Sequence, residues 1–185
     1  AEEGPSALQY AGGQGDPRLR EVLTGLMRHE GIRGSGGDVV VTEGSQQALD
    51  LLARMFCDPG DVIVAEGPSY VGALSAFSQY QVEVRHVPLD DEGLEPDALD
   101  ETLQGLKREG RRVKFLYTIP TYQNPAGVSM SRERREQVER ALDVVPVQLL
   151  VAAVDDRAPP AALLVAVDLE ADARARPHQL DLATL

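Results

Sequence analysis

The stretch Tyr117-Thr118-Ile119-Pro120-Thr121-Tyr122-Gln123-Asn124-Pro125-Ala126-Gly127 guides the interpretation of the whole chain. It continues an apolar run from Val113 that has the β-branched and aromatic content of a buried strand. The run closes on the turn-initiating pair Asn124-Pro125 and on Gly127. Asn124 is therefore expected at the C-terminal end of a core strand, where open α/β sheets bind ligands. The alternative is an ordinary turn capped by Asn124, and this stretch alone favours that alternative.

The composition indicates a globular chain with one sizeable core. Of its 185 residues, 26% are charged and 43% apolar. The net charge of −12 argues against non-specific binding of nucleic acid or of an anionic membrane, but it leaves room for a small phosphate pocket. No apolar run approaches the length of a membrane span, and no signal peptide is recognised. The only cysteine, Cys57, cannot form an internal disulfide and has apolar neighbours, so we expect a packed thiol and a reducing, cytoplasmic location.

Helical and strand-like patterns alternate along the chain. Apolar residues at helical spacing predict helices at 17–30, 45–57, 71–80, 95–109 and 131–144. β-branched runs predict strands at 39–42, 62–65, 82–87 and 113–118. This order predicts an α/β fold with a mostly parallel sheet and helices on both of its faces.

The segment from Val39 to Ala48 combines a β-branched run, Gly44 and the start of a helix. The free N–H groups and the dipole at a helix N-terminus attract anions. Ser45 and Gln46 can add side-chain donors to a phosphate there. The alternative is plain helix capping by Ser45, which is equally consistent with this segment.

Tyr70 follows the strand predicted at 62–65, on the same edge as Ser45 and Asn124. Its ring could stack on a flat ligand, or it could pack over the strand end as part of the core. Three polar features at three strand ends favour a binding site over coincidence. His29 and His86 are isolated, and no spacing typical of metal ligands is present, so no metal site is expected.

These residues also carry a family resemblance. The motifs occur in the expected order: Gln9-Tyr10, Pro17-Arg18-Leu19-Arg20, Thr42-Glu43-Gly44-Ser45-Gln46-Gln47-Ala48-Leu49, Asp58-Pro59-Gly60-Asp61, Glu66-Gly67-Pro68-Ser69-Tyr70, Asp90-Asp91-Glu92-Gly93-Leu94 and Gln123-Asn124-Pro125-Ala126-Gly127. Over residues 7–144 the chain resembles class I/II aminotransferases, which are fold-type-I pyridoxal-phosphate enzymes. The 2-aminoadipate aminotransferases are the most similar subgroup. Similar domains also occur fused to winged-helix transcription regulators.

The resemblance implies a role for each site residue. Ser45 and Gln46 would hold the phosphate of pyridoxal 5'-phosphate, and Tyr70 would stack on its pyridine ring. Asn124 would bond to the 3′ oxygen of the ring. Tyr10 would reach the partner's cofactor across a homodimer interface. The reaction implied moves an amino group between an amino acid and a 2-oxo acid, with the cofactor as electron sink.

The chain departs from the family where the family's chemistry takes place. The family attaches its cofactor to a lysine in a Ser-x-x-Lys segment. Here the only lysines are Lys107 and Lys114, and neither has that context. Asp155 is the candidate for the carboxylate that pairs with the pyridine nitrogen. Its spacing from Asn124 is long, and Ala158 stands where the family has Tyr. We therefore assign no catalytic residue and expect the chain to be inactive by itself.

The composition changes near Val144, so we predict three parts. They are an arm at 1–16, a partial cofactor-binding large domain at 17–144, and a divergent or frameshifted tail at 145–185. The start at Ala1 suggests a fragment or a processed terminus. The function classes that remain are an aminotransferase fragment, a ligand-sensing domain of a winged-helix regulator, and a fragment with no function of its own. The residues that would select the amino acid are mostly missing from the sequence.

Overall fold

The computed structural model describes residue 4 and residues 9–10, 12–29, 34–142, 148–154 and 162–167. The chain divides into two compact units, Ala1–Glu43 and Gly44–Leu185. The division into arm, partial domain and tail drawn from the sequence stays a prediction.

The first unit contains α1 (Pro17–His29) and the short 3-10 helix η2 (Gly36–Asp38). The start of α1 follows the prediction, because the Asp16 carboxylate accepts a hydrogen bond from the backbone N–H of Arg18 at 2.8 Å. Leu19, Val22 and Leu26 of this amphipathic helix are exposed.

The strand predicted at 39–42 is wrong. Val39 is extended, with φ −106° and ψ 129°, but this segment pairs with no strand in the described part of the chain. Instead the N–H of Val41 donates to the carbonyl of Gln14 at 3.0 Å, and Gly15 lies so close that an added Cβ would be 2.7 Å from the Cβ of Val41. The β-branched run favours an extended backbone, and a loop rather than a strand lies beside it.

The second unit is built on a six-stranded sheet of order β3-β2-β1-β4-β5-β6. Its strands are β1 (Val62–Gly67), β2 (Glu83–Asp90), β3 (Gly93–Leu94), β4 (Val113–Thr118), β5 (Gln148–Val154) and β6 (Ala162–Val167). The four central strands are parallel, and the edge strands β3 and β6 are antiparallel to their neighbours. The prediction of a mostly parallel sheet is confirmed, although the sequence analysis contained no prediction for β3, β5 or β6.

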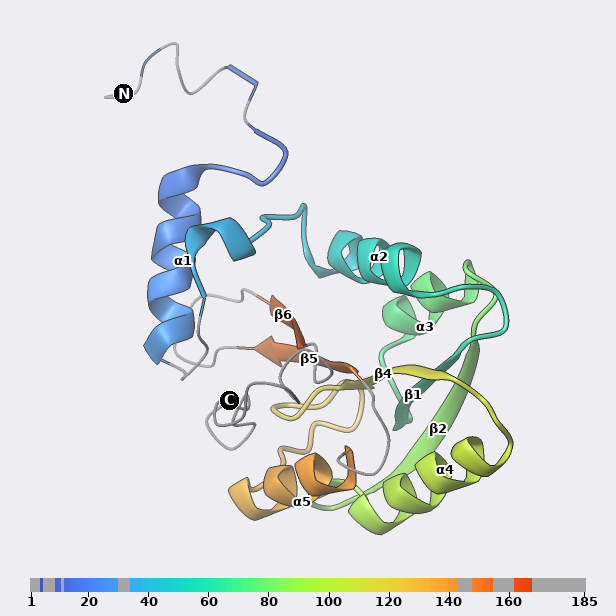
Figure 1. The fold of residues 1–185 in the computed structure, drawn as a ribbon. Coiled ribbons are helices and arrows are strands. Elements are labelled where there is room, and N and C mark those ends of the chain that lie inside the picture. The colour runs from blue at the N-terminus through green and yellow to red at the C-terminus, as the bar shows by residue number, and fades with distance from the viewer. Residues whose placement is uncertain are drawn as a thin grey trace. The chain divides into compact units, whose positions relative to one another are not determined.

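Four helices cover the two faces of this sheet (Figure 1). They are α2 (Ser45–Phe56), α3 (Val71–Ser78), α4 (Pro96–Arg108) and α5 (Arg132–Leu142), all within a few residues of the predicted ranges. Alternate residues of β1 face opposite layers. Val62 and Val64 pack in one buried cluster with residues of α4 and α5. Ile63 and Ala65 pack in a second cluster with residues of α2 and α3, which confirms helices on both faces.

Candidate functional site

The C-terminal ends of β1 and β4 lie side by side in the sheet. The two strands are parallel neighbours, and Ala65 is level with Tyr117. The loop that carries Tyr70 follows β1, and the loop that carries Asn124 follows β4. Both loops therefore leave the same edge, as the sequence predicted, and this is the edge at which parallel α/β sheets bind ligands.

A buried carboxylate joins these two strand ends. Glu66 is fully buried, and its Oε1 accepts hydrogen bonds from the Thr118 hydroxyl at 2.5 Å and from the Ile119 N–H at 3.1 Å. Its Oε2 accepts from the Gln123 side-chain amide at 3.0 Å. Burial raises the pKa of Glu66, and the three donors oppose that rise.

Gln123 organises the loop around Asn124. Its side-chain amide also donates to the carbonyl of Pro68 at 2.9 Å, and its Oε1 accepts from the N–H of Ala126 at 2.8 Å. The backbone of Gln123 bonds to Val128 and Gly127. Asn124 itself is exposed, and the peptide bond Asn124–Pro125 is cis. A neighbouring amide, that of Gln123, therefore shapes the loop that carries the exposed Asn124.

Arg135 of α5 holds the same loop at its base. Its Nε donates to the carbonyl of Met130 at 3.2 Å, and its Nη2 donates to the Thr121 hydroxyl at 2.9 Å. Arg135 is buried, and that burial lowers its pKa. The sequence of this helix, Arg132-Glu133-Arg134-Arg135-Glu136, is typical of an exposed surface with short-range ion pairs. The exposed pair of Arg132 and Glu136 agrees, at 3.2 Å, but Arg135 faces inward.

The N-terminus of α2 is bonded to the start of α3. The side-chain amide of Gln46 donates to the carbonyl of Gly72 at 2.9 Å. The N-cap of α2 is Gly44, with φ +90° and no side-chain capping bond. The alternative of capping by Ser45 is therefore wrong, because Ser45 is the first helical residue. The Gln46 bond brings the first turn of α2 beside the first turn of α3, which directly follows Tyr70.

The ring of Tyr70 lies over Gly72. A Cβ added to Gly72 would be 2.4 Å from Cζ of Tyr70. Tyr70 is partly buried and packs against the apolar cluster between the sheet and helices α2 and α3. One part of the ring thus belongs to the core, as the alternative held, and the other part is accessible.

Two predicted site residues cannot be related to this edge. Asp155 lies outside the described residues. Tyr10 is fully exposed and belongs to the other compact unit. Conversely, sequence reasoning did not single out Glu66, Gln123 or Arg135. The only signals for them were an acidic residue at the end of a buried strand and an amide just before Asn124-Pro125.

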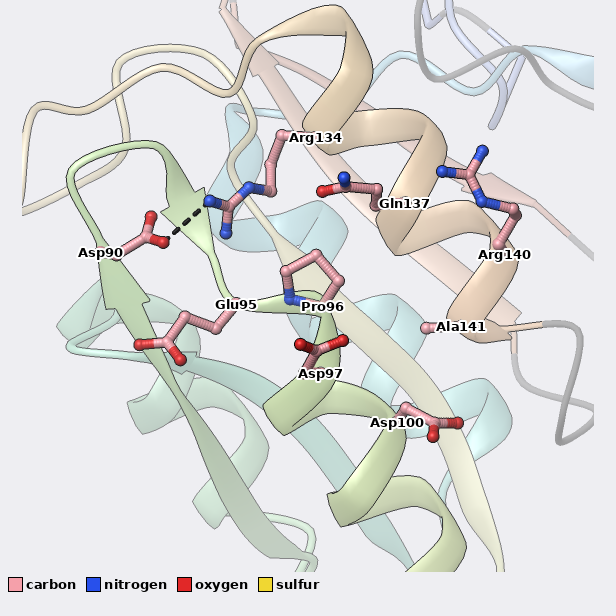
Figure 2. A pocket seen from close by; sticks show the side chains of 9 residues that line it. All are labelled: Asp90, Glu95, Pro96, Asp97, Asp100, Arg134, Gln137, Arg140 and Ala141. Atoms are coloured by element: carbon pink, nitrogen blue, oxygen red, sulfur yellow. Dashed lines mark hydrogen bonds and ion pairs between the residues drawn. The ribbon is translucent and has the colours of Figure 1, made fainter.

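A pocket of about 500 Å³ lies between α4 and α5 (Figure 2), and neither Tyr70 nor Asn124 lines it. Asp97 and Asp100 of α4 line one side of it, Arg140 of α5 lines the other, and Arg134 lies at one end. Arg134 is buried, and its Nη2 donates to the carboxylates of Asp90 and Glu92, both at 2.8 Å. These ion pairs connect α5 to the turn between β2 and β3.

Cys57 is half-buried beside the cluster of α2 and α3, which agrees with a packed thiol. Burial, with the nearby Asp61 carboxylate, raises the pKa of the thiol to about 11. Among the described residues, no group of three or more His, Cys, Asp or Glu side chains is arranged to hold a metal ion. None of the described helices is long and apolar enough to span a membrane.

The family model "Aminotransferase class I and II" matches residues 1–151. The chain belongs to this family. The match runs past Val144 into β5, beyond the 7–144 range of the motifs that suggested the resemblance.

Three similar proteins illustrate the relationship. An aromatic-amino-acid aminotransferase of Thermococcus litoralis is 51% identical over 133 residues, which are 71% of this chain and 32% of that protein. An uncharacterized HTH-type transcriptional regulator of Bacillus subtilis is 32% identical over 132 residues, covering 71% of this chain and 26% of the regulator. The crystal structure of an alpha-aminoadipate aminotransferase of Thermus thermophilus, complexed with N-(5'-phosphopyridoxyl)-L-leucine, matches 99% of this chain and 55% of that chain. Its TM-score is 0.71, with 27% identity. The chain thus spans about a third of the length of the first curated relative.

Proposed function

We propose that this chain is the cofactor-holding part of an aminotransferase-family protein, that it binds pyridoxal 5'-phosphate without a covalent bond, and that it does not transfer amino groups by itself. One observation carries the proposal. The bonds from the Gln46 amide to the Gly72 carbonyl and from the Gln123 amide to Glu66 connect the segments that carry Ser45, Tyr70 and Asn124.

The donor set at this edge fits a phosphate and a flat ring. Gly44 has no side chain that could cover the first turn of α2, so a phosphate could approach its N–H groups and the Ser45 hydroxyl. Tyr70 offers a partly accessible aromatic ring for stacking. The exposed Asn124 amide can donate to a ring oxygen, and the contacts of Gln123 hold its loop in place.

Covalent attachment does not fit the described residues. Lys114, which the sequence placed at the start of a strand, forms an ion pair with Asp61 at the other edge of the sheet. Lys107 lies in the last turn of α4, at the end of the helix that leads into β4. When bound, the cofactor supplies an electron sink for negative charge at the α carbon of an amino acid. Among the described residues, no side chain offers an amine at that edge, so this chain supplies no amino group for the attachment.

The expectations about the complete protein follow from the family. Its substrates would be an amino acid and a 2-oxo acid, it would be a cytoplasmic homodimer, and Tyr10 would reach the cofactor of the partner subunit. Asp155 would be the partner of the pyridine nitrogen. These are proposals for a longer protein, since this chain spans 32% of its aminotransferase relative.

The test is a visible-absorbance titration of the purified chain with pyridoxal 5'-phosphate. Pyridoxal, which lacks the phosphate, is the matched ligand control. We expect saturable binding of the phosphate form and weaker binding of pyridoxal. Ser45→Ala should weaken phosphate-form binding by about tenfold, the equivalent of one hydrogen bond to a charged group. Ser78→Ala, at the C-terminal end of α3, is the matched control and should bind normally. Absence of saturable binding by the wild-type chain would contradict the proposal.

A second candidate is a ligand-sensing domain of a transcription regulator, which would bind its ligand beside Ser45, Tyr70 and Asn124 without turnover. The similarity to the HTH-type regulator of Bacillus subtilis supports this candidate. The coding sequence upstream of Ala1 distinguishes the two, because a winged-helix segment in the same frame is expected only for the regulator. Reading residues 145–185 in the other two frames also tests the frameshift hypothesis. Restoration of Asp-Asp-x-Tyr and Ser-x-x-Lys segments is the outcome expected from a frameshift.

A further inference from the structure

We propose that Glu66 is a positioning residue that holds the Asn124 loop against the Tyr70 loop, with Gln123 as its partner across the two loops. The proposal rests on the proposed function, since Tyr70 and Asn124 are the groups that this pair would orient around the cofactor.

The position of Glu66 is unusual for a carboxylate. It follows the four buried apolar residues of β1, Val62 to Ala65, and is itself fully buried. Burial of a charge is unfavourable unless its oxygens are well bonded. An apolar side chain could complete the strand equally well, because the pairing of β1 with β4 uses the backbone. The carboxylate must therefore be explained by its contacts.

The contacts of Glu66 are all with the end of β4 and the loop that follows it. The two donors to Oε1, the Thr118 hydroxyl and the Ile119 N–H, come from the end of β4 and the residue after it. The donor to Oε2 is the side chain of Gln123, the residue before Asn124. Glu66 thus connects the end of β1 to two separate parts of the neighbouring segment, its beginning and the turn five residues later.

Gln123 also contacts the loop after β1, which carries Tyr70. Its Nε2 donates to Glu66 at 3.0 Å and to the carbonyl of Pro68 at 2.9 Å. Pro68 is two residues before Tyr70. An amide nitrogen has two hydrogens, so both are used, one on each side of Gly67. The Oε1 of Gln123 accepts from Ala126, two residues after Asn124. The pair therefore links the residues that flank Asn124 to those that precede Tyr70.

Two substitutions separate this role from general stability. Glu66→Gln keeps the shape but replaces one carboxylate oxygen by an NH₂ group, which faces the Gln123 amide in one orientation and the Ile119 N–H in the other, so two donors face each other in either case. Gln123→Met removes the two bonds across the loops, together with the bond from the Ala126 N–H, and leaves Glu66 with its Thr118 and Ile119 donors. If the Glu66→Gln protein fails to fold, Gln123→Met by itself tests the proposal. Asp61→Asn is the matched control, because Asp61 also has a well-shielded carboxylate but lies at the opposite edge of the sheet.

The first measurement is amide hydrogen exchange without any ligand. The N–H groups of Gln123, Ala126 and Gly127 are hydrogen-bonded within the loop. We expect Glu66→Gln and Gln123→Met to raise the exchange rates of Gln123 and Gly127 by about tenfold, the equivalent of one lost hydrogen bond. The rate of Ala126 is compared only for Glu66→Gln, because Gln123→Met removes the acceptor of the Ala126 N–H. Asp61→Asn should leave these rates as they are in the wild type. Unchanged rates in both loop variants, or an equal rise in the control, would overturn the proposal.

The second measurement is the pyridoxal 5'-phosphate titration of the same proteins. Glu66→Gln and Gln123→Met should each weaken binding by about tenfold, while Asp61→Asn, although less stable, should bind within about twofold of the wild type. Equal weakening in all three variants would mean that Glu66 serves stability alone, and would overturn the positioning role. If the wild-type chain does not bind the cofactor, the proposed function fails, while hydrogen exchange still decides whether Glu66 holds the loop.

Discussion

Lys114 and Asp61 form a well-shielded ion pair, with 3.0 Å between Nζ and Oδ2 and side-chain exposures of 11% and 14%. Asp61 directly precedes β1, and Lys114 is the second residue of β4. Both residues therefore lie at the N-terminal edge of the sheet. From Lys114 to Thr118 at the other end of β4 the distance is about 13 Å, at roughly 3.3 Å per residue. The lysine amine is thus at the wrong edge to meet a ligand beside Tyr70 and Asn124.

The first prediction is that this chain does not attach the cofactor covalently. After incubation with pyridoxal 5'-phosphate and reduction by borohydride, mass mapping should find no stoichiometric label on Lys107 or Lys114. The reason is the position of Lys114 and its pairing with Asp61. Stoichiometric labelling of one lysine, together with turnover of an amino acid, would show that the chain is a working aminotransferase. Free lysine ethyl ester in the same reaction is the control for reduction.

The second prediction concerns the pH dependence of stability. Burial raises the pKa of Asp61, but the bonds from the Asp58 N–H and Lys114 outweigh it, so the net pKa lies below its usual value of 3.8. A depressed carboxyl pKa contributes stability that is present above pH 3.8 and is lost as the pH falls through the folded-state pKa. Asp61→Asn should therefore lower the free energy of unfolding by about 1–3 kcal/mol at pH 7, and by less near pH 3.

Urea unfolding at both pH values measures this difference. Asp91→Asn, in the exposed turn between β2 and β3, is the control and should have a small effect at either pH. An equal loss of stability at pH 7 and pH 3 in the Asp61 variant would refute the role of its charge.

Local patterns in the sequence were sufficient for most of the fold. The helices at α2 and α4 follow from apolar residues at helical spacing, and β1 and β4 follow from short β-branched and aromatic runs bounded by turns. The run at Val39 to Thr42 is as rich in β-branched residues as the start of β1, yet it is not a strand. Composition favours an extended backbone, but whether a strand forms depends on a neighbour that pairs with it, and that cannot be read locally.

In the candidate site, the sequence could place only those residues that come just after a predicted strand. Tyr70 and Asn124 could be placed at one edge because parallel strands end together. Gln123 and Glu66 are 57 residues apart in the sequence, and no local pattern around either residue predicts their contact. Arg135 was missed for a related reason. A charged helix face is ordinarily solvated, and only tertiary packing reveals which of its arginines is buried.

The third prediction is that Arg135 cannot be replaced by lysine. Its guanidinium donates from Nε to the Met130 carbonyl and from Nη2 to the Thr121 hydroxyl, and a single ammonium group cannot reproduce that fork. Arg135→Lys should lower the free energy of unfolding by about 1–3 kcal/mol. Arg132→Lys on the same helix is the control, since Arg132 is exposed and its pairing with Glu136 suits either cation. Equal urea midpoints for the two variants would show that the buried contacts contribute little.

The last prediction uses Gly72 to move Tyr70 without changing Tyr70 itself. Gly72 lies in the first turn of α3, where alanine would ordinarily stabilise the helix by about 0.5–1 kcal/mol. Its added Cβ would be 2.4 Å from Cζ and 2.5 Å from the hydroxyl oxygen of Tyr70, so the ring must move. Because those atoms are at the far end of a side chain, the ring can rotate away while the helix stays folded.

The free energy of unfolding of Gly72→Ala should therefore lie within about 1 kcal/mol of the wild-type value. Its near-ultraviolet circular dichroism should nevertheless change, and its affinity for pyridoxal 5'-phosphate should fall by about tenfold. Gly105→Ala in α4 is the matched control, because the nearest atom to its added Cβ is Nη2 of Arg108 at 4.0 Å. That variant should gain stability, with an unchanged aromatic spectrum and unchanged binding. If Gly72→Ala binds as tightly as Gly105→Ala while its aromatic spectrum changes, the ring of Tyr70 has moved without affecting the cofactor, and its assignment as the stacking residue is wrong.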